Sequence, residues 1–305
     1  MSFTLPQFGI FAQGTLAHHF LEFDLRPGVA PKDAVASFRR LRTPEVSAGG
    51  VNLVLGFGAS AWREVAPDGA PASLEVFAEV VGVAGHRAPA TQHDAWMWIS
   101  GSAPDTAFDH ARAAAATVAD VAMLAAEQPG FTYHEGHDET GFIDGTANPP
   151  IRGAADIALV PPGEPGEAGS HVLVMRWVHD LDAFHRLSVH DQERVIGRTK
   201  IDSVELTDAE KPSDAHIARV GGIEIDGEEL QIFRRSVPYG TVDEHGLYFV
   251  AFSADPTRFD RMLARMFGLD GVRDRLTDFS RPVSGAQYFA PSLTALMQLA
   301  GPEDG

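Results

Sequence analysis

Residues 95–105, AWMWISGSAPD, decide the fold because they join a short apolar strand to the start of a helix. The run from Ala95 to Ser100 has the aromatic and aliphatic composition of a buried strand. The segment Ser102-Ala103-Pro104-Asp105 then supplies residues with which helices begin, so a helix is expected over the Ala-rich stretch from Phe108 to Ala126. A strand that leads into a helix indicates a protein of mixed α and β structure.

The same order of strand and helix returns in the second half of the chain at a constant offset. Trp98 corresponds to Phe249 (249 − 98 = 151), and Phe23 and Val174 have the same separation. Weak identity at a fixed offset predicts a duplicated α+β unit of the βαββαβ type, with a ligand cleft between the two halves. The alternative is a chance alignment of common elements.

The remaining elements follow from local composition. The expected strands and helices, besides those above, are strands at His19–Leu25, Val51–Phe57, His171–Val178 and Leu247–Ala251 and helices at Pro31–Leu41 and Thr257–Phe267. Between the repeats, the run from Pro161 to Gly166 carries too many prolines and glycines for regular structure. We therefore expect an N-terminal half over 1–150, a linker over 151–170 and a C-terminal half over 171–305.

The composition excludes several classes of protein. The chain has 305 residues, of which 44% are hydrophobic and 22% charged, as in ordinary soluble globular proteins. It carries 24 Lys and Arg against 42 Asp and Glu, a formal net charge of −18. This charge disfavours binding to nucleic acid and to anionic membrane surfaces.

The sequence contains no cysteine, so disulfides, iron–sulfur clusters and thiolate ligands are excluded. A metal or a cofactor iron would have to be held by nitrogen or oxygen. The segment from Met1 to Phe11 lacks a basic leader region, and no apolar run is long enough to span a bilayer. We expect a cytoplasmic protein, and the tail 300–305 shows no apolar docking peptide for an encapsulating shell.

The stretch Gly141-Phe142-Ile143-Asp144-Gly145-Thr146-Ala147-Asn148-Pro149 is the first candidate for a functional site. It presents the Asp144 carboxylate from a bare loop, because glycines permit unusual backbone conformations and close approach. The alternative is an ordinary turn, since Asp and Gly are common turn residues.

Two neighbouring arginines lie in a predicted strand from Leu230 to Ser236. Side chains alternate along a strand, so Ile232, Arg234 and Ser236 share one face and Arg235 lies on the other. One arginine must therefore point inward, where it needs an anionic partner or ligand. Arg234 is the better candidate because it shares its face with Ile232. The alternative is that both arginines lie on the surface.

His216 is one of 13 histidines, and the sequence contains no paired histidines at metal-ligand spacing. Most single histidines are structural or exposed. A single histidine can nevertheless be an axial iron ligand, because haem supplies the other four nitrogens itself.

The segment Gly141–Thr146, followed by His216 and then by Phe233-Arg234-Arg235-Ser236, resembles the dye-decolourising peroxidase family with its GxxDG motif, and its B-type members in particular. The segment 193–200 and Tyr239-Gly240 also match that family. The resemblance implies a haem b enzyme of two ferredoxin-like halves, with antiparallel sheets that enclose the haem pocket. It implies that His216 is the proximal iron ligand and that Asp144 and Arg234 are the distal catalytic pair.

The resemblance also implies residues that contact the cofactor. Arg198 and Arg219 match residues that bind the haem propionates, although a surface charge is the alternative for Arg219. Ser236 stands where relatives carry a small polar residue, and Leu247 and Phe249 resemble the apolar distal wall or are plain core. Asp278 is expected to accept the ring proton of His216 and to raise its donor strength.

By this resemblance the protein reduces hydrogen peroxide through ferryl intermediates and oxidises dyes, phenols or other small reductants, without nucleic acid or membrane partners and as a homo-oligomer. Asp144 would carry the proton, and Arg234 would stabilise the anionic oxygen and hold Asp144 ionised. Two alternatives remain. One is a haem-binding or iron-releasing module without peroxidase turnover, and the other is a metal-free acidic binding protein in which Asp144 and Arg234 form a structural salt bridge.

Overall fold

The computed structural model describes residues 4–41, 50–225 and 227–299. The expectations that concern Met1–Phe3 and the tail 300–305 lie outside these residues. None of the helices within the described ranges combines the length and the apolar composition that crossing a membrane requires.

The N-terminal half contributes four antiparallel strands in the order β2-β5-β1-β6. These strands are β1 (Ala17–Leu25), β2 (Asn52–Phe57), β5 (Ala95–Gly101) and β6 (Ala122–Phe131). When the four strands are numbered along the chain, their order across the sheet is second, third, first and fourth. This is the order of a βαββαβ unit, in which helices connect the first strand to the second and the third to the fourth.

The C-terminal half repeats this order as β10-β12-β7-β14. Its strands are β7 (Ser170–His179), β10 (Phe233–Arg234), β12 (His245–Ser253) and β14 (Ala286–Ala290), and β11 (Val237–Gly240) and β13 (Ser280–Pro282) are paired with β12 and β7. Again the second strand is followed by the third, the first and the fourth. The α+β fold class is confirmed, and the boundaries at 1–150, 151–170 and 171–305 stay a prediction.

The two halves join edge to edge and wrap around a shared core. Phe289 of β14 pairs with Phe57 of β2, which makes one sheet of the two units. At the other side Gly130 of β6 lies against Val237 of β11, where a Cβ on the glycine would come within 2.7 Å of a valine methyl group. The inner cluster between the halves is rich in aromatic rings, among them Phe20, Trp96, Trp98, Phe233, Tyr248, Phe252 and Tyr288.

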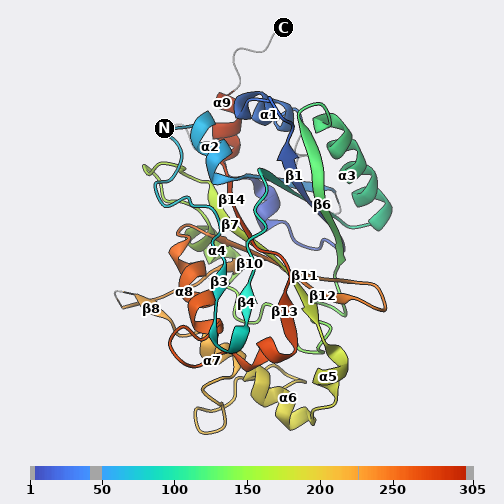
Figure 1. Ribbon diagram of the computed structural model, residues 1–305, viewed down its shortest axis with the longest axis vertical. Coiled ribbons are helices and arrows are strands. Elements are labelled where there is room, and N and C mark those ends of the chain that lie inside the picture. The colour runs from blue at the N-terminus through green and yellow to red at the C-terminus, as the bar shows by residue number, and fades with distance from the viewer. Residues whose placement is uncertain (1–3, 42–49, 226, 300–305) are drawn as a thin grey trace.

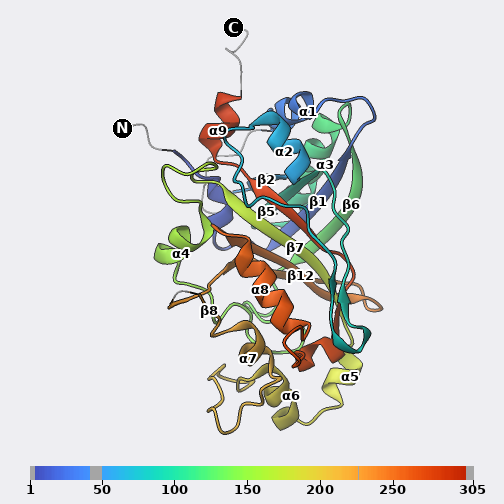
Figure 2. The ribbon, with the colours of Figure 1, turned by 60° about the vertical axis from the view of Figure 1, so that its left-hand side comes forward.

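Helices cover the outer faces of the sheet. On the N-terminal half, helices α1 (Pro31–Phe38), α2 (Ala59–Val65), α3 (Pro104–Val118) and α9 (Leu293–Gln298) bury a second apolar cluster at one end of the molecule (Figure 1). On the C-terminal half, α8 (Thr257–Met266) runs along β7 and β12, as Figure 2 shows. Helices α5 (Leu181–His185), α6 (Val189–Ile196) and α7 (His216–Val220) gather at the opposite end (Figure 1).

The short elements complete the chain: 3-10 helices η1 (Phe8–Phe11), η2 (Val83–Gly85) and η3 (Arg275–Asp278), helix α4 (Ile151–Ala158), and the strand pairs β3 (Val80–Val81) with β4 (Arg87–Ala88) and β8 (Glu224–Ile225) with β9 (Glu228–Glu229). Helix α4 lies within the expected linker. The run from Pro161 to Gly166 that follows it is irregular, as predicted.

Two local predictions were wrong. The expected helix over Phe108–Ala126 ends at Val118, and the residues from Ala122 form β6, because pairing with β1 outweighs the helix propensity of alanine. In the expected strand from Leu230 to Ser236, only Phe233 and Arg234 are paired, with Phe252 and Ala251.

The loop that carries Asp144 is anchored by the residue two positions before it. The Phe142 ring packs edge to face on Phe184 of α5 at 6.2 Å, in a small apolar cluster with Val195 of α6. Gly141 has φ +87°, and a Cβ there would lie 2.7 Å from Cε of Lys200. The first glycine of the motif is therefore required by the backbone and by the packing of the loop.

Asn148 fastens the other end of this loop to β10. Its side-chain Nδ2 donates to the carbonyl of Arg234 at 2.8 Å, and its Oδ1 accepts the backbone N–H of Arg234 at 2.9 Å. The side chain thus replaces a strand partner and satisfies both backbone groups of Arg234. Residues 86 positions apart are held in one register by this amide.

We expect Asn148→Ala to lower the free energy of unfolding by roughly 1–3 kcal/mol, because two partly buried backbone groups lose their partners. Asn148→Asp keeps an acceptor for the N–H of Arg234 but places a carboxylate oxygen against the Arg234 carbonyl, so a loss at least as large is expected. Denaturant unfolding measures both. An unchanged unfolding free energy in Asn148→Ala would contradict the role of this amide.

Candidate active site

The larger cavity of the described residues, about 840 Å³, lies on the outer face of the C-terminal half. Its walls come from β7, β12, α7, α8 and the loop 138–147. The loop 138–147 belongs to the expected N-terminal half over 1–150, so residues from both expected halves line this cavity. The strands and helices that form most of its walls belong to the C-terminal half.

The walls of the cavity are largely apolar. Leu247 and Phe249 of β12 line one side, as predicted, together with Met175 of β7. Helix α8 supplies the facing side chains of Phe259, Met262, Leu263 and Met266. A cavity of this size, with apolar walls on the sheet and on α8 and charged side chains elsewhere in its lining, is suited to a flat organic ligand that carries polar groups.

His216, the first residue of α7, lines the cavity and is oriented by a buried carboxylate. Its Nδ1 lies 2.7 Å from Oδ2 of Asp274, whose side chain is 0% exposed. The other oxygen of Asp274 accepts the N–H of Leu276 and caps η3. Because Nδ1–H donates to this carboxylate, Nε2 is the nitrogen that remains for a ligand or a metal.

The prediction that Asp278 accepts the ring proton of His216 was wrong. Asp278 forms an ion pair with Arg273 at 2.6 Å, is 42% exposed and does not line the cavity. Asp274 and Asp278 stand four residues apart in the same short segment. Burial distinguishes the two carboxylates, because Asp274 is 0% exposed and Asp278 is 42% exposed.

Asp144 lines the cavity from a loop held by backbone hydrogen bonds. Its Oδ1 accepts the N–H of Gly145 at 2.7 Å, and its own N–H donates to Gly136. Burial raises the pKa of the Asp144 carboxyl above the ordinary value, although the charge of Arg234 acts in the opposite direction. We expected Arg234 to hold this carboxylate ionised, but the desolvation of the loop has the larger effect.

Arg234 and Ser236 reach the same cavity from β10 and the residues after it. Ile232, Arg234 and Ser236 all line it, which confirms the predicted alternation. Among the contacts of the described residues, none occupies the guanidinium of Arg234. This cation is therefore available to a ligand beside Asp144.

Arg235 lies on the opposite face and is also enclosed. Its guanidinium stacks 5.3 Å from the Trp98 ring and donates to the carbonyl of Ile10 at 2.9 Å. Burial lowers the pKa of Arg235 to about 10. Both arginines thus point inward, where the sequence required only one to do so.

Of the two arginines expected to bind the haem propionates, only Arg198 lines the cavity. Arg219 is 6% exposed, and its guanidinium is occupied by the carboxylate of Asp270. Arg219 is turned toward this ion pair and does not line the cavity, so the structure contradicts its expected contact with the cofactor. Arg198 itself donates to the carbonyl of Ser203 at 2.9 Å and to Glu205 at 3.4 Å.

Arg265 of α8 is a cavity residue that the sequence reasoning missed. It donates to the carbonyls of Ala218 and Gly221 in and after α7. Burial and the nearby charge of Arg219 lower the pKa of Arg265. Arg265 lies one helical turn after Met262, so the sequence places a cation on the apolar side of α8. This position could have identified Arg265 as a candidate cavity residue.

The donor atoms decide which cofactor this site can hold. Within the described residues, no group of three or more His, Asp or Glu side chains is arranged to hold a metal ion. A single histidine with a carboxylate behind it, in an apolar cavity bordered by arginines, fits a cofactor that brings its own metal ligands and its own negative charge.

Comparison with known proteins agrees with this geometry. Residues 7–132 match the family model for the N-terminal part of Dyp-type peroxidases, and residues 135–295 match the model for the C-terminal part. The Asp144 loop thus falls within the C-terminal model. The chain is 36% identical to a dye-decolorizing peroxidase of Rhodococcus erythropolis over 288 residues, which cover 91% of this chain and 84% of that protein.

Solved structures show the same likeness. A putative Dyp-type peroxidase from Shewanella oneidensis superposes with a TM-score of 0.92 at 30% identity. The superposition covers 98% of this chain and 100% of that chain. A variant of DypB from Rhodococcus jostii in complex with heme gives a TM-score of 0.86 at 33% identity, over 93% of this chain and 96% of that one. His216, Asp144 and Arg234 all fall within residues 135–295, the range that the C-terminal family model matches. The chain belongs to the Dyp-type peroxidase family.

Proposed function

We propose that this protein is a haem b peroxidase that reduces hydrogen peroxide and oxidises dyes, phenols or other small reductants. The observation that carries the proposal is His216, held at Nδ1 by the buried Asp274, in one cavity with Asp144 and Arg234. Family membership and the heme complex of the related DypB support it.

The residues present fit a haem. His216 Nε2 would ligate the iron, and the Asp274 carboxylate would raise the donor strength of the ring. Arg198 and Arg265 would neutralise the propionates, because both are cations on the border of the cavity. Ser236, Leu247 and Phe249 would contact the cofactor on the side of the sheet. Bound haem would supply the redox-active iron at which the O–O bond of peroxide is cleaved.

Asp144 and Arg234 perform the proton and charge chemistry in this proposal. Heterolytic cleavage of the O–O bond of peroxide requires that a proton move from one oxygen to the other. A carboxylate can accept this proton and deliver it. The guanidinium of Arg234 stabilises the negative charge that develops on the departing oxygen. The raised pKa of Asp144 brings its proton affinity closer to that of a useful acid and base near neutral pH.

The metal-free alternative requires a structural salt bridge between Asp144 and Arg234. No ion pair of the described residues joins these two side chains, although both line the cavity. No observation favours the alternative of a haem-binding module without turnover.

Location in the cytoplasm and assembly into a homo-oligomer also stay proposals. Support for self-association comes from apolar side chains exposed on β6, where Met123, Leu124 and Phe131 are 41%, 46% and 38% exposed.

The test of the proposed function is to load the protein with haem and to add one equivalent of hydrogen peroxide. We expect a haem absorption band that changes rapidly with peroxide. Arg234→Ala is expected to slow this change by roughly 10²–10³-fold, because a fixed charge is lost from a water-poor site. Asp144→Ala is expected to slow it less, since water can replace part of a proton shuttle. An Arg234→Ala protein that reacts as fast as the parent would refute the assignment of Arg234.

The carboxylate behind His216 has a matched control four residues away. Asp274→Asn is expected to weaken haem binding by roughly 10–100-fold and to lower the iron–histidine stretching frequency, because the ring loses its charged acceptor. Asp278→Asn, in contrast, removes a carboxylate that is paired only at the surface and should change neither quantity. Haem titration and resonance Raman spectroscopy measure both. Equal effects of the two substitutions would contradict the role of Asp274.

The pH dependence follows from the direction of the pKa shift at Asp144. Because burial raises this pKa, the loss of reaction rate with falling pH should begin above the ordinary value of about 3.9. The charge of Arg234 lowers the same pKa, so Arg234→Gln should move this acidic limb to higher pH. Rates normalised to each variant's own maximum measure the shift. An acidic limb at unchanged or lower pH in Arg234→Gln would contradict the coupling.

A further inference from the structure

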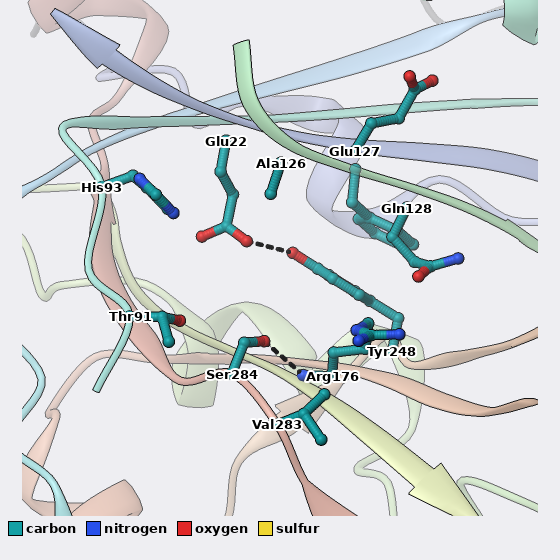
Figure 3. Close-up of a pocket in the computed structure, with 11 residues that line it drawn as sticks. Glu22, Thr91, His93, Ala126, Glu127, Gln128, Arg176, Tyr248, Val283 and Ser284 are labelled. Carbon is teal, nitrogen blue, oxygen red and sulfur yellow. Dashed lines mark hydrogen bonds between the residues drawn. The ribbon is translucent and has the colours of Figure 1, made fainter. Parts of the chain in front are cut away.

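A second cavity of about 480 Å³ lies between the two halves of the molecule, and no step of the proposed mechanism uses it. Its lining comes from β1, β6, β7, β12 and the connecting segments at 91–93 and 283–284. Figure 3 shows Glu22 and Tyr248 directed toward one another, with His93 and Thr91 on one side and Gln128 on the other.

The floor of this cavity holds a buried carboxylate. Glu22 is 5% exposed, and its two oxygens accept the hydroxyl groups of Tyr288 at 2.6 Å and Tyr248 at 3.5 Å. A carboxylate has about four lone-pair sites, so two remain for further donors. Burial raises the pKa of Glu22, while the Tyr288 hydroxyl and the charge of His93 act against the rise.

The charged groups around Glu22 are already paired with others. His93 lies 2.8 Å from Asp24, and Arg176 lies 2.6 Å from Glu244. Glu127 at the border is paired with His19 at 3.0 Å. Each cation near the cavity therefore has its own carboxylate, and Glu22 is satisfied only by hydroxyl donors. A ligand that carries a negative charge is disfavoured, and a ligand that donates a hydrogen bond is favoured.

One wall is aromatic, and the border is open. The rings of Phe20 and Tyr248 stack at 4.1 Å with an angle of 14° between their planes. Both side chains are buried, whereas Ala126 and Glu127 at the border are exposed. A flat molecule can therefore enter past β6 and place its polar group at the floor, against Glu22.

The cavity lies directly behind the proposed haem cavity, across the sheet. Met175 and Trp177 of β7 line the larger cavity, and Arg176 between them lines the smaller one. On β12, Leu247 and Phe249 line the larger cavity, and Tyr248 lines the smaller one. Because side chains alternate along a strand, a molecule bound in the smaller cavity is separated from the larger one by these two strands alone.

We propose that the smaller cavity is a binding site for a neutral phenol or aromatic amine, whose hydroxyl or amino group donates a hydrogen bond to Glu22. The ring of the ligand lies along Tyr248 and Phe20, and the two tyrosine hydroxyls that already bind Glu22 show the chemistry that this carboxylate accepts. That such a ligand serves as the reductant rests on the proposed peroxidase function. The binding itself does not.

The test is the binding of guaiacol, a neutral methoxyphenol, to the haem-loaded protein by isothermal titration calorimetry without peroxide. We expect one site, no change in the haem absorption band, and weaker binding of the anionic phenolsulfonate. Glu22→Gln, which replaces one acceptor oxygen with an NH2 donor, and Ala126→Phe, which fills the entrance, should each weaken guaiacol binding at least about tenfold. Ala125→Phe is the matched control, because Ala125 is exposed on the same strand and lies outside the cavity lining, and should bind as the parent does.

Unchanged guaiacol affinity in both Glu22→Gln and Ala126→Phe would overturn the proposal. Loss of guaiacol binding when cyanide occupies the haem would overturn it as well. Haem uptake and the reaction with peroxide are measured on the same samples before guaiacol is added. Their failure alongside intact guaiacol binding would refute the peroxidase function alone. Ala126→Phe keeps the test decisive if Glu22→Gln does not fold.

Discussion

The side-chain amide of Asn148 is the connection on which the geometry of the site depends. Its two hydrogen bonds to the backbone of Arg234 join the loop of Asp144 to β10, at 2.8 and 2.9 Å. On the other side of Asp144, the Phe142 ring fixes the loop to α5 and α6. A carboxylate and a guanidinium from distant parts of the chain thereby lie in one cavity although they form no ion pair with each other. Their separation leaves both groups free for a small ligand.

The alternation of side chains on β7 and β12 organises the rest of the molecule. These strands are the first and third of the C-terminal unit and lie at its centre, so both of their faces are covered. One face turns toward α8 and the larger cavity, and the other turns toward the N-terminal half. A single pair of strands therefore forms a wall of two chemically different cavities, one apolar around a histidine and one polar around Glu22.

The repeat at constant spacing predicted the duplicated α+β fold because each unit keeps the same order of strand and helix. The face on which Arg234 lies was also predictable, since it follows from alternation alone. Asp274 could not be separated from Asp278, and Arg219 could not be recognised as the partner of Asp270, because both distinctions depend on which residues of the segment 270–278 approach α7 in the folded chain. The helix expected up to Ala126 ended early for a similar reason: β1 offers β6 a complete set of backbone partners, which local propensity cannot foresee.

Arg235 has a consequence for the chemical durability of the protein. Trp98 is an indole at the centre of the inner core, and a guanidinium rests 5.3 Å from its ring without a carboxylate among its described contacts to neutralise it. Removal of an electron from an indole creates positive charge, which a neighbouring cation in a poorly screened interior makes unfavourable. An enzyme that handles strong oxidants is exposed to self-inflicted damage. The Arg235 charge makes Trp98 harder to oxidise and so shields the core from that damage.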